Sequence, residues 1–196
     1  KAVTRFGKPI PWFTYPAIDF LITKDFSSSR VLEFGGGQST GFWSANAESV
    51  ITFETDENWI LEIKKLTNDA NNVSVLKAPI DSTQKNYVAN ELKDIGEKFN
   101  VIVIDGMQRS EMFLLAMNYL KDDGLVICDN SDGYGFYEAW QKFPDFLRVD
   151  FYGHSPGVIH PHQTSIIFGK NCSFMNINNS IYTKNYQSNS MPYLYK

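Results

Sequence analysis

Residues 31–40 read Val31-Leu-Glu-Phe-Gly35-Gly36-Gly37-Gln-Ser-Thr40, so a short apolar run leads directly into three consecutive glycines. The apolar run predicts a strand, and Ser39 or Thr40 is a good N-cap for a following helix. Glycines let a ligand approach the backbone closely, and the first turn of a helix offers N–H groups without partners. The stretch therefore predicts a strand, a ligand-binding loop and a helix.

The same alternation of strand and helix patterns continues along the chain. Further apolar runs occupy residues 50–54, 73–76, 101–104 and 124–128, with helically spaced apolar residues between them. Such alternation predicts a mostly parallel sheet. Residues 147–151 and 164–168 have no helix pattern between them, so we expect them to pair antiparallel. The predicted fold is a Rossmann-like, doubly wound α/β fold in three α/β/α layers, with an antiparallel last strand.

The length of 196 residues favours a single domain. We divide it into an N-terminal cap segment (1–25), a core (26–170) and a polar C-terminal extension (171–196), and the extension is a candidate surface for homo-oligomers. The net charge is −4. Without a basic patch, nucleic acid is not the expected partner.

Localisation is expected to be cytoplasmic, without membrane association. No apolar stretch approaches the ~20 residues that span a bilayer. The two cysteines, Cys128 and Cys172, cannot form a disulfide framework by themselves.

An acidic residue, Glu54, ends the second predicted strand. In dinucleotide-binding folds a carboxylate at this place accepts hydrogen bonds from ribose hydroxyls. The dinucleotide fingerprint Gly-x-Gly-x-x-Gly is not met, however, because Gly41 follows Gly37 one position too late. The glycine spacing therefore argues against an NAD-type dinucleotide cofactor.

The segment Glu33-Phe34-Gly35-Gly36-Gly37 resembles the first motif of the class I S-adenosylmethionine-dependent methyltransferases, which reads acidic-x-Gly-x-Gly. The resemblance extends over residues 11–168 and includes uncharacterised bacterial methyltransferases. It implies that the glycine loop wraps the methionine part of S-adenosylmethionine and that Glu54 binds the ribose. The cofactor contacts predicted in this way are Glu33, Gly35, Gly36, Gly37, Ser39, Glu54, Asp81 and Asp105.

Acidic and amide side chains follow the fourth and fifth predicted strands, at Asp105 and at Asp129-Asn130. This pattern resembles the metal-dependent branch that includes catechol O-methyltransferase, and it implies that Asp105, Asp129 and Asn130 bind Mg²⁺. The lysine that serves as general base in that enzyme is replaced here by Gln108, followed by Arg109. The alternative is ordinary turn chemistry, because Asp-Gly and Asp-Asn are common at strand ends.

All three histidines, His154, His160 and His162, lie between the last two predicted strands. A histidine there is a candidate general base, because its pKa suits proton removal near neutral pH. A substrate contact, a metal ligand and a solvated loop are the alternatives. The predicted catalytic residues are Asp105, Arg109 and His154. Trp12 and Tyr15 either cover the cofactor pocket or close the bottom of the core.

The function predicted from this resemblance is methyl transfer from S-adenosylmethionine to an oxygen of a small molecule, such as a sugar or another polar metabolite. One alternative is a non-catalytic methyltransferase-like binding module, which the missing lysine favours. An NAD-type oxidoreductase is the other alternative, and the glycine spacing argues against it.

Overall fold

Seven strands form one sheet in the computed structural model, which describes residues 2–4, 6–68 and 70–176. The strand order is β3-β2-β1-β4-β5-β7-β6, and only β7 runs antiparallel to its neighbours. The predicted doubly wound α/β fold with an antiparallel last strand is confirmed. The strands are β1 (Arg30–Phe34), β2 (Ser49–Glu54), β3 (Val73–Lys77), β4 (Phe99–Ile104), β5 (Leu120–Cys128), β6 (Leu147–Gly153) and β7 (His162–Phe168).

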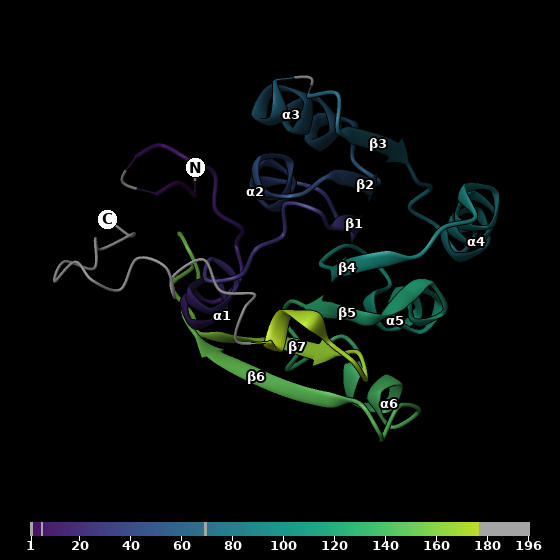
Figure 1. The fold of residues 1–196 in the computed structure, drawn as a ribbon. Coiled ribbons are helices and arrows are strands. Elements are labelled where there is room, and N and C mark those ends of the chain that lie inside the picture. The colour runs from purple at the N-terminus through teal and green to yellow at the C-terminus, as the bar shows by residue number, and fades with distance from the viewer. Residues whose placement is uncertain (1, 5, 69, 177–196) are drawn as a thin grey trace, which may run out of the picture.

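Helices cover both faces of the sheet (Figure 1). One face packs against α1 (Tyr15–Leu21), α2 (Gln38–Asn46) and α3 (Glu57–Thr67), and the other against α4 (Gln84–Ile95), α5 (Arg109–Ala116) and α6 (Phe136–Trp140). Each face has its own apolar core. In β4, alternate residues contribute to the two cores, with Val101 and Val103 on one side and Ile102 and Ile104 on the other. A continuously apolar strand is what burial on both faces requires.

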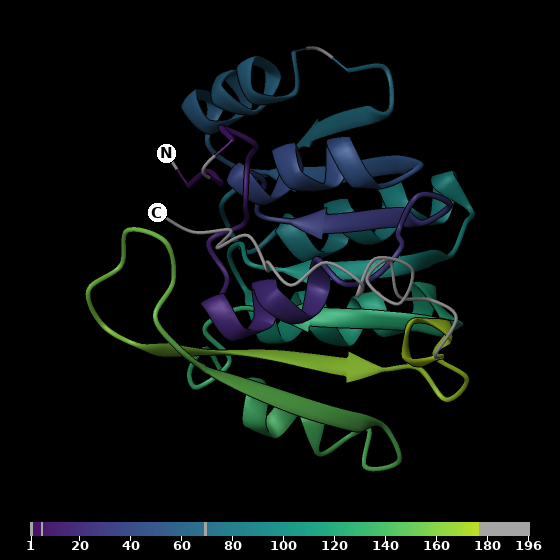
Figure 2. The same cartoon turned by 60° about the vertical axis from the view of Figure 1, so that its left-hand side comes forward.

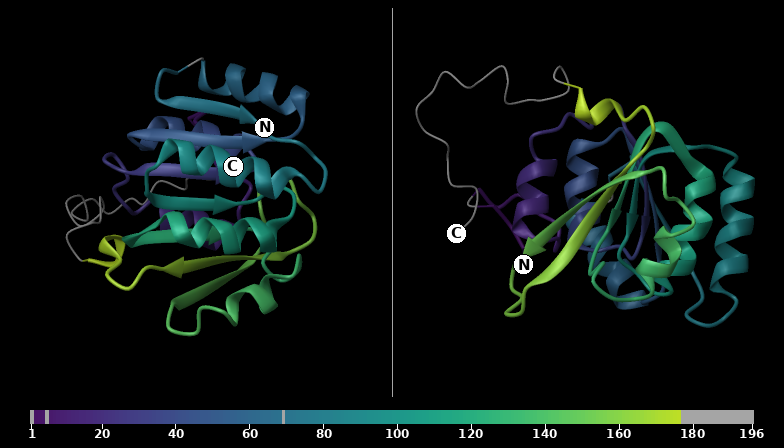
Figure 3. Two further views of the ribbon diagram at one scale, coloured as in Figure 1. Left: turned by 90° about the vertical axis from the view of Figure 1, so that its right-hand side faces the viewer. Right: turned by 90° about the horizontal axis from the view of Figure 1, so that it is seen from below.

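The last two strands form a long hairpin at one end of the sheet (Figures 2 and 3). Strand β6 pairs antiparallel with β7, and β7 pairs antiparallel with β5, so β6 runs in the same direction as β5. The connection 154–161 therefore begins at the carboxyl edge of the parallel strands. This edge is where ligands bind in doubly wound folds.

Some boundaries differ from the sequence expectations. Helix α2 begins at Gln38 with Gly37 as its N-cap, so neither Ser39 nor Thr40 caps it. Strand β5 begins at Leu120, which pairs with Phe99 and extends the predicted strand backwards. The pairing with Phe99 is therefore what brings Leu120 into the strand.

The C-terminal extension is described only as far as residue 176. In the short helix η2 (Ser173–Met175), Phe174 is buried and its ring lies 4.8 Å from that of Phe26. The extension thus begins by packing on the core, although its sequence is polar. The predicted oligomer contact involves residues 177–196 as well, and these lie outside the described residues. Among the described helices, none combines the length and apolar character needed to cross a lipid bilayer.

Candidate active site

The glycine loop between β1 and α2 packs against the loop that follows β4. Gly35 has a φ of 89°, and a Cβ there would lie 2.5 Å from the backbone nitrogen and Cα of Gly106. A side chain would collide with backbone, and the positive φ would strain it as well. Gly37 has no such restriction, because a Cβ there would meet no atom within 4 Å. The fold thus requires a glycine at 35, whereas the space beside Gly37, which lines a cleft, is left open.

Glu33 lies beneath this loop and is completely buried. Its Oε2 accepts a hydrogen bond from the Thr40 hydroxyl at 2.5 Å, and that hydroxyl accepts one from the backbone N–H of Gly37 at 2.9 Å. Burial raises the pKa of Glu33 to about 7, and hydrogen bonds that favour its charged form oppose the rise only in part. Glu33 does not line the cleft. Its predicted direct cofactor contact is therefore corrected to support of the loop from below.

Glu54 ends β2 and lines the cleft. Its Oε1 accepts hydrogen bonds from the backbone N–H groups of Thr55 at 2.6 Å and Asp56 at 2.9 Å. Only 7% of the residue is exposed. One carboxylate oxygen is therefore held by the backbone, and no described residue hydrogen-bonds the other. Such an arrangement presents a fixed acceptor to a ligand.

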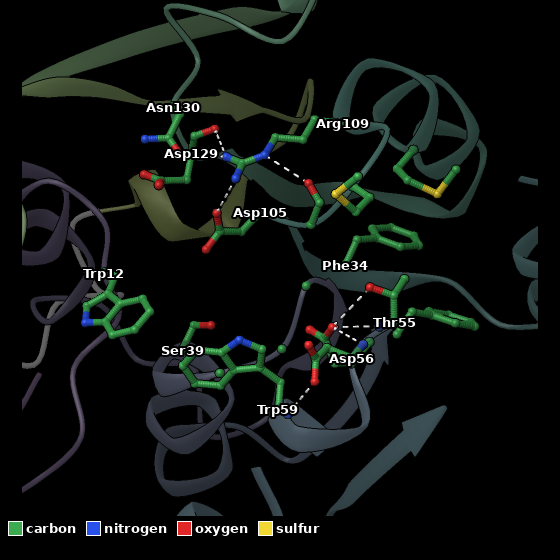
Figure 4. A pocket seen from close by; sticks show the side chains of 18 of the residues that line it. Trp12, Phe34, Ser39, Thr55, Asp56, Trp59, Asp105, Arg109, Asp129 and Asn130 are labelled. Atoms are coloured by element: carbon green, nitrogen blue, oxygen red, sulfur yellow. Dashed lines mark hydrogen bonds and ion pairs between the residues drawn. The ribbon is translucent and has the colours of Figure 1, made fainter. Parts of the chain in front are cut away.

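The cleft has a volume of about 510 Å³ and runs along the carboxyl ends of β1, β2, β4 and β5 (Figure 4). Its charged residues are mostly acidic, with Arg109 as the permanent cation among the lining residues. On one side lie Ser39, Trp59 and the glycine loop, and across from them lie Asp105, Arg109 and Asn130. The polar and aromatic lining residues include Trp12, Ser39, Glu54, Thr55, Asp56, Trp59, Gln84, Asp105, Arg109, Asp129, Asn130, Tyr134, Ser155 and His162.

Arg109 joins the ends of β4 and β5. Its Nε donates to the carbonyl of Gly106 at 3.0 Å, and its Nη1 donates to the carbonyl of Asp129 at 2.6 Å and to Oδ1 of Asn130 at 2.9 Å. Its Nη2 lies 3.1 Å from Oδ1 of Asp105. Burial raises the pKa of Asp105, the charge of Asp129 adds to this, and Arg109 opposes it. The sequence-predicted residues Asp105, Arg109, Asp129 and Asn130 are thus brought together.

Their arrangement does not fit the predicted Mg²⁺ site. One carboxylate oxygen of Asp105, Oδ1, and the amide oxygen of Asn130 are bound by the guanidinium of Arg109. The described residues contain no group of three or more His, Cys, Asp and Glu side chains that could hold a metal ion. Mg²⁺ is therefore not supported as a cofactor, because an arginine already supplies the positive charge.

No protein-family model and no curated protein matches this sequence. Solved structures do match it. A precorrin-6y C5,15-methyltransferase from Geobacter metallireducens is 12% identical, with a TM-score of 0.59 over 78% of this chain and 86% of that one. A proposed caffeoyl-CoA O-methyltransferase from Staphylococcus aureus is 18% identical, with a TM-score of 0.52 over 71% and 76% of the two chains. The fold is that of the class I methyltransferases.

A third structure with the methyltransferase fold contains a ligand. It is a proposed methyltransferase from Streptococcus mutans, solved in complex with S-adenosylhomocysteine. It is 17% identical to this chain, with a TM-score of 0.51 over 76% of this chain and 94% of that one. At these identities the comparisons establish the methyltransferase fold, and the activity of this chain has to be argued from its own cleft.

Within this methyltransferase fold the histidine at the cleft is His162, not the predicted His154. His154 is exposed, does not line the cleft, and contributes only its carbonyl oxygen to the backbone N–H of Tyr15. His162 is 9% exposed, and its Nε2 lies 3.5 Å from Oδ1 of Asp129. Its proximity to Asp129 raises the pKa of His162, against a smaller effect of burial. The sequence signal available for His162 was strand alternation. If the predicted strand 164–168 is extended back by two residues, His162 lies on the same side as Thr164.

Asp81, predicted to bind the cofactor, is exposed outside the cleft, where its Oδ1 accepts a hydrogen bond from the backbone N–H of Thr83 at 2.8 Å. Trp59, which the sequence analysis did not single out as a site residue, lines the cleft from α3. Its ring meets that of Trp12 edge to face at 5.7 Å. Of the two predicted positions for Trp12, the structure shows the one at the pocket.

Proposed function

We propose that this chain is an S-adenosylmethionine-dependent methyltransferase that methylates an oxygen of a small polar molecule. The observation that carries the proposal is that the glycine loop and Glu54 line the same acidic cleft in a methyltransferase fold. Both features lie beyond the carboxyl ends of neighbouring parallel strands, β1 and β2.

The residues at this end fit the cofactor. Glu54 offers a carboxylate oxygen to the two ribose hydroxyls, and its other oxygen is held by the backbone. Gly37 leaves room for the methionine part, and the first turn of α2 presents backbone N–H groups to its carboxylate. S-adenosylmethionine, when bound, supplies an electrophilic methyl group on a positively charged sulfur.

The charge of the cleft supports this cofactor over a dinucleotide. Four acidic residues line it, against one arginine: Glu54, Asp56, Asp105 and Asp129, opposed by Arg109. A negative cleft attracts a cationic sulfonium compound and repels the two phosphates of NAD. This electrostatic argument agrees with the glycine spacing, which does not meet the dinucleotide fingerprint.

The other half of the cleft suits a hydroxyl acceptor. A hydroxyl must lose its proton as its oxygen forms the new bond to carbon, so a base has to lie nearby. His162 lines this half, with Asp129 beside its Nε2. In its neutral form the imidazole of His162 has a nitrogen lone pair that can take the acceptor proton. The polar residues Asn130 and Ser155 suit a polar metabolite.

Calorimetric titration of S-adenosylmethionine and S-adenosylhomocysteine tests the cofactor assignment. We expect wild type to bind both and Glu54→Ala to bind at least tenfold more weakly, which corresponds to about 1.4 kcal/mol. Glu57→Ala is the matched control, because Glu57 pairs with Lys77 outside the cleft. Absence of binding in wild type would contradict the proposal. Binding without transfer to any of a panel of hydroxylated acceptors would favour a non-catalytic binding module.

The base is tested separately, with an acceptor from the same panel. We expect His162→Asn to lower kcat by 10²- to 10⁴-fold, the usual contribution of general base catalysis, with little change in cofactor affinity. His154→Asn should leave the rate unchanged if the structural assignment is right. If His154→Asn lowered kcat and His162→Asn did not, His154 would be the general base instead.

A further inference from the structure

The positive charge in the acceptor half of the cleft belongs to the protein itself. Arg109 is the first residue of α5 and directly follows Gln108, which is in the left-handed conformation with a φ of 50°. Only 10% of the Arg109 side chain is exposed. Its Cζ also lies 4.5 Å from the ring centre of Tyr134, which packs over the guanidinium. The guanidinium is therefore held in one place by contacts on several sides.

A divalent cation at this position would need the same oxygens. Mg²⁺ takes about six oxygen ligands at about 2.1 Å, in a strict octahedron. Oδ1 of Asp105, Oδ1 of Asn130 and the carbonyl oxygen of Asp129 already contact the guanidinium. The carboxylate of Asp129 is engaged elsewhere, since its Oδ1 accepts a hydrogen bond from the Thr164 hydroxyl at 2.6 Å. A metal bound by these oxygens would have to displace the Arg109 guanidinium, which would then lose its partners and repel the incoming ion.

We propose that the Arg109 guanidinium takes the place of a divalent cation in this cleft, and that methyl transfer here is independent of metal ions. The inference rests on the proposed function and extends it to the class of acceptor. An acceptor that has to bind a metal ion through two neighbouring oxygens is therefore not expected to be a substrate. The acceptor is instead one with a single reacting hydroxyl, bound by direct hydrogen bonds to groups such as Asn130 and His162.

The charge of Arg109 has a second consequence for the site. An arginine stays protonated throughout the accessible pH range, so its charge does not depend on pH or on the supply of metal. The guanidinium lies beside Asp105 and Asp129, and its positive charge offsets the electrostatic repulsion between these two acidic groups at the strand ends. The arrangement of these acidic groups therefore does not require a bound metal ion.

Binding of Mn²⁺, followed by its electron paramagnetic resonance signal, tests the proposal without any need for an acceptor. The protein is used whole, with and without S-adenosylhomocysteine. We expect wild type to leave the signal of the free ion unchanged. We expect Arg109→Ala, which frees the oxygens of Asp105 and Asn130, to bind one Mn²⁺ per chain at least tenfold more tightly than wild type. Arg109→Lys keeps a positive charge and should exclude the ion as wild type does.

Stoichiometric Mn²⁺ binding by wild type that is lost in Asp105→Asn would overturn the proposal. A folded Arg109→Ala chain that still excludes Mn²⁺ would also overturn it, because the guanidinium would then not be what keeps the metal out. If Arg109→Ala does not fold, the comparison of wild type with Asp105→Asn still decides. Titration of S-adenosylhomocysteine into the same samples reports on the proposed function independently, so failure of one inference is distinguishable from failure of the other.

Discussion

A carboxyl group with a pKa of about 7 lies beneath the glycine loop, and its titration affects folding. Because the folded pKa of Glu33 is raised above its ordinary value of 4.5, the folded state binds the proton more tightly than the unfolded state does. The stability from this group is complete below pH 4.5 and is lost as the pH rises through 7, by roughly 3 kcal/mol.

Glu33→Gln keeps the shape of the side chain and an acceptor for Thr40, but it cannot ionise. We expect the variant to need more urea than wild type for unfolding at about pH 8, with the difference shrinking toward acid pH. Tryptophan fluorescence during urea titration measures this. A difference that stays constant across the pH range would contradict the assigned pKa.

The two ends of the glycine loop should respond differently to alanine. In Gly35→Ala the new methyl group meets the Gly106 backbone at 2.5 Å at a positive φ, so we expect a loss of about 1–3 kcal/mol in the free energy of unfolding. In Gly37→Ala no atom lies within 4 Å of the new methyl group, so stability should change little. Cofactor affinity should still fall, because that methyl group enters the cleft. Denaturant unfolding and calorimetry of both variants measure the contrast.

The pairing of His162 with Asp129 can be observed without a substrate. Asp129 raises the pKa of His162, so its imidazole should stay protonated to a higher pH than an ordinary histidine with a pKa of 6.5. Asp129→Asn should lower the pKa of His162 toward or below 6.5. Titration by nuclear magnetic resonance measures this, with the other two histidines as internal references that the substitution should not affect. A His162 pKa that does not move would show that Asp129 is not its partner.

At the scale of an element, α3 begins directly after a side-chain cap. Asp56 caps the helix, with its Oδ1 accepting hydrogen bonds from the backbone N–H groups of Asn58 at 2.7 Å and Trp59 at 3.3 Å. Asp56→Ala should cost about 1 kcal/mol of stability, whereas Asp56→Asn retains an acceptor and should be nearly neutral. Thermal unfolding compares the two. Equal losses would show that the cap contributes nothing.

At the scale of the whole molecule, Thr164 connects three distant segments. Its hydroxyl accepts a hydrogen bond from the backbone N–H of Thr14 at 2.9 Å and donates one to Asp129 at 2.6 Å. The N-terminal segment, β7 and the end of β5 are thereby joined beside the cleft. Thr164→Val keeps the volume but leaves the buried N–H of Thr14 without a partner, and we expect a loss of about 1–3 kcal/mol.

Thr164→Ser keeps the hydroxyl and is the control for this substitution. Chemical denaturation measures the stabilities of both variants. The valine variant should also weaken methyl transfer, because Asp129 loses the hydroxyl that holds it in place beside His162. If valine and serine variants were equally stable, the hydrogen bonds of Thr164 would not be what joins the three segments.

The alternation of strands and helices was determined by the sequence itself, because side-chain spacing along one segment decides which of its faces is buried. The glycine loop and Glu54 belong to the same class of prediction, since each lies at the end of a recognisable strand. Their meeting at one cleft follows from the parallel pairing of β1 with β2.

The arrangement of side chains at the ends of β4 and β5 was decided only by the tertiary structure. Sequence resemblance placed a metal among Asp105, Asp129 and Asn130, and the fold places the guanidinium of Arg109 there instead. It likewise replaces His154 by His162, because β7 begins at the cleft beside the end of β5. The physical reason is the same in both cases. The contacts of Arg109 with Asn130 and of His162 with Asp129 join residues that are far apart in the sequence, so they depend on strand order, register and side-chain direction, which no local pattern encodes.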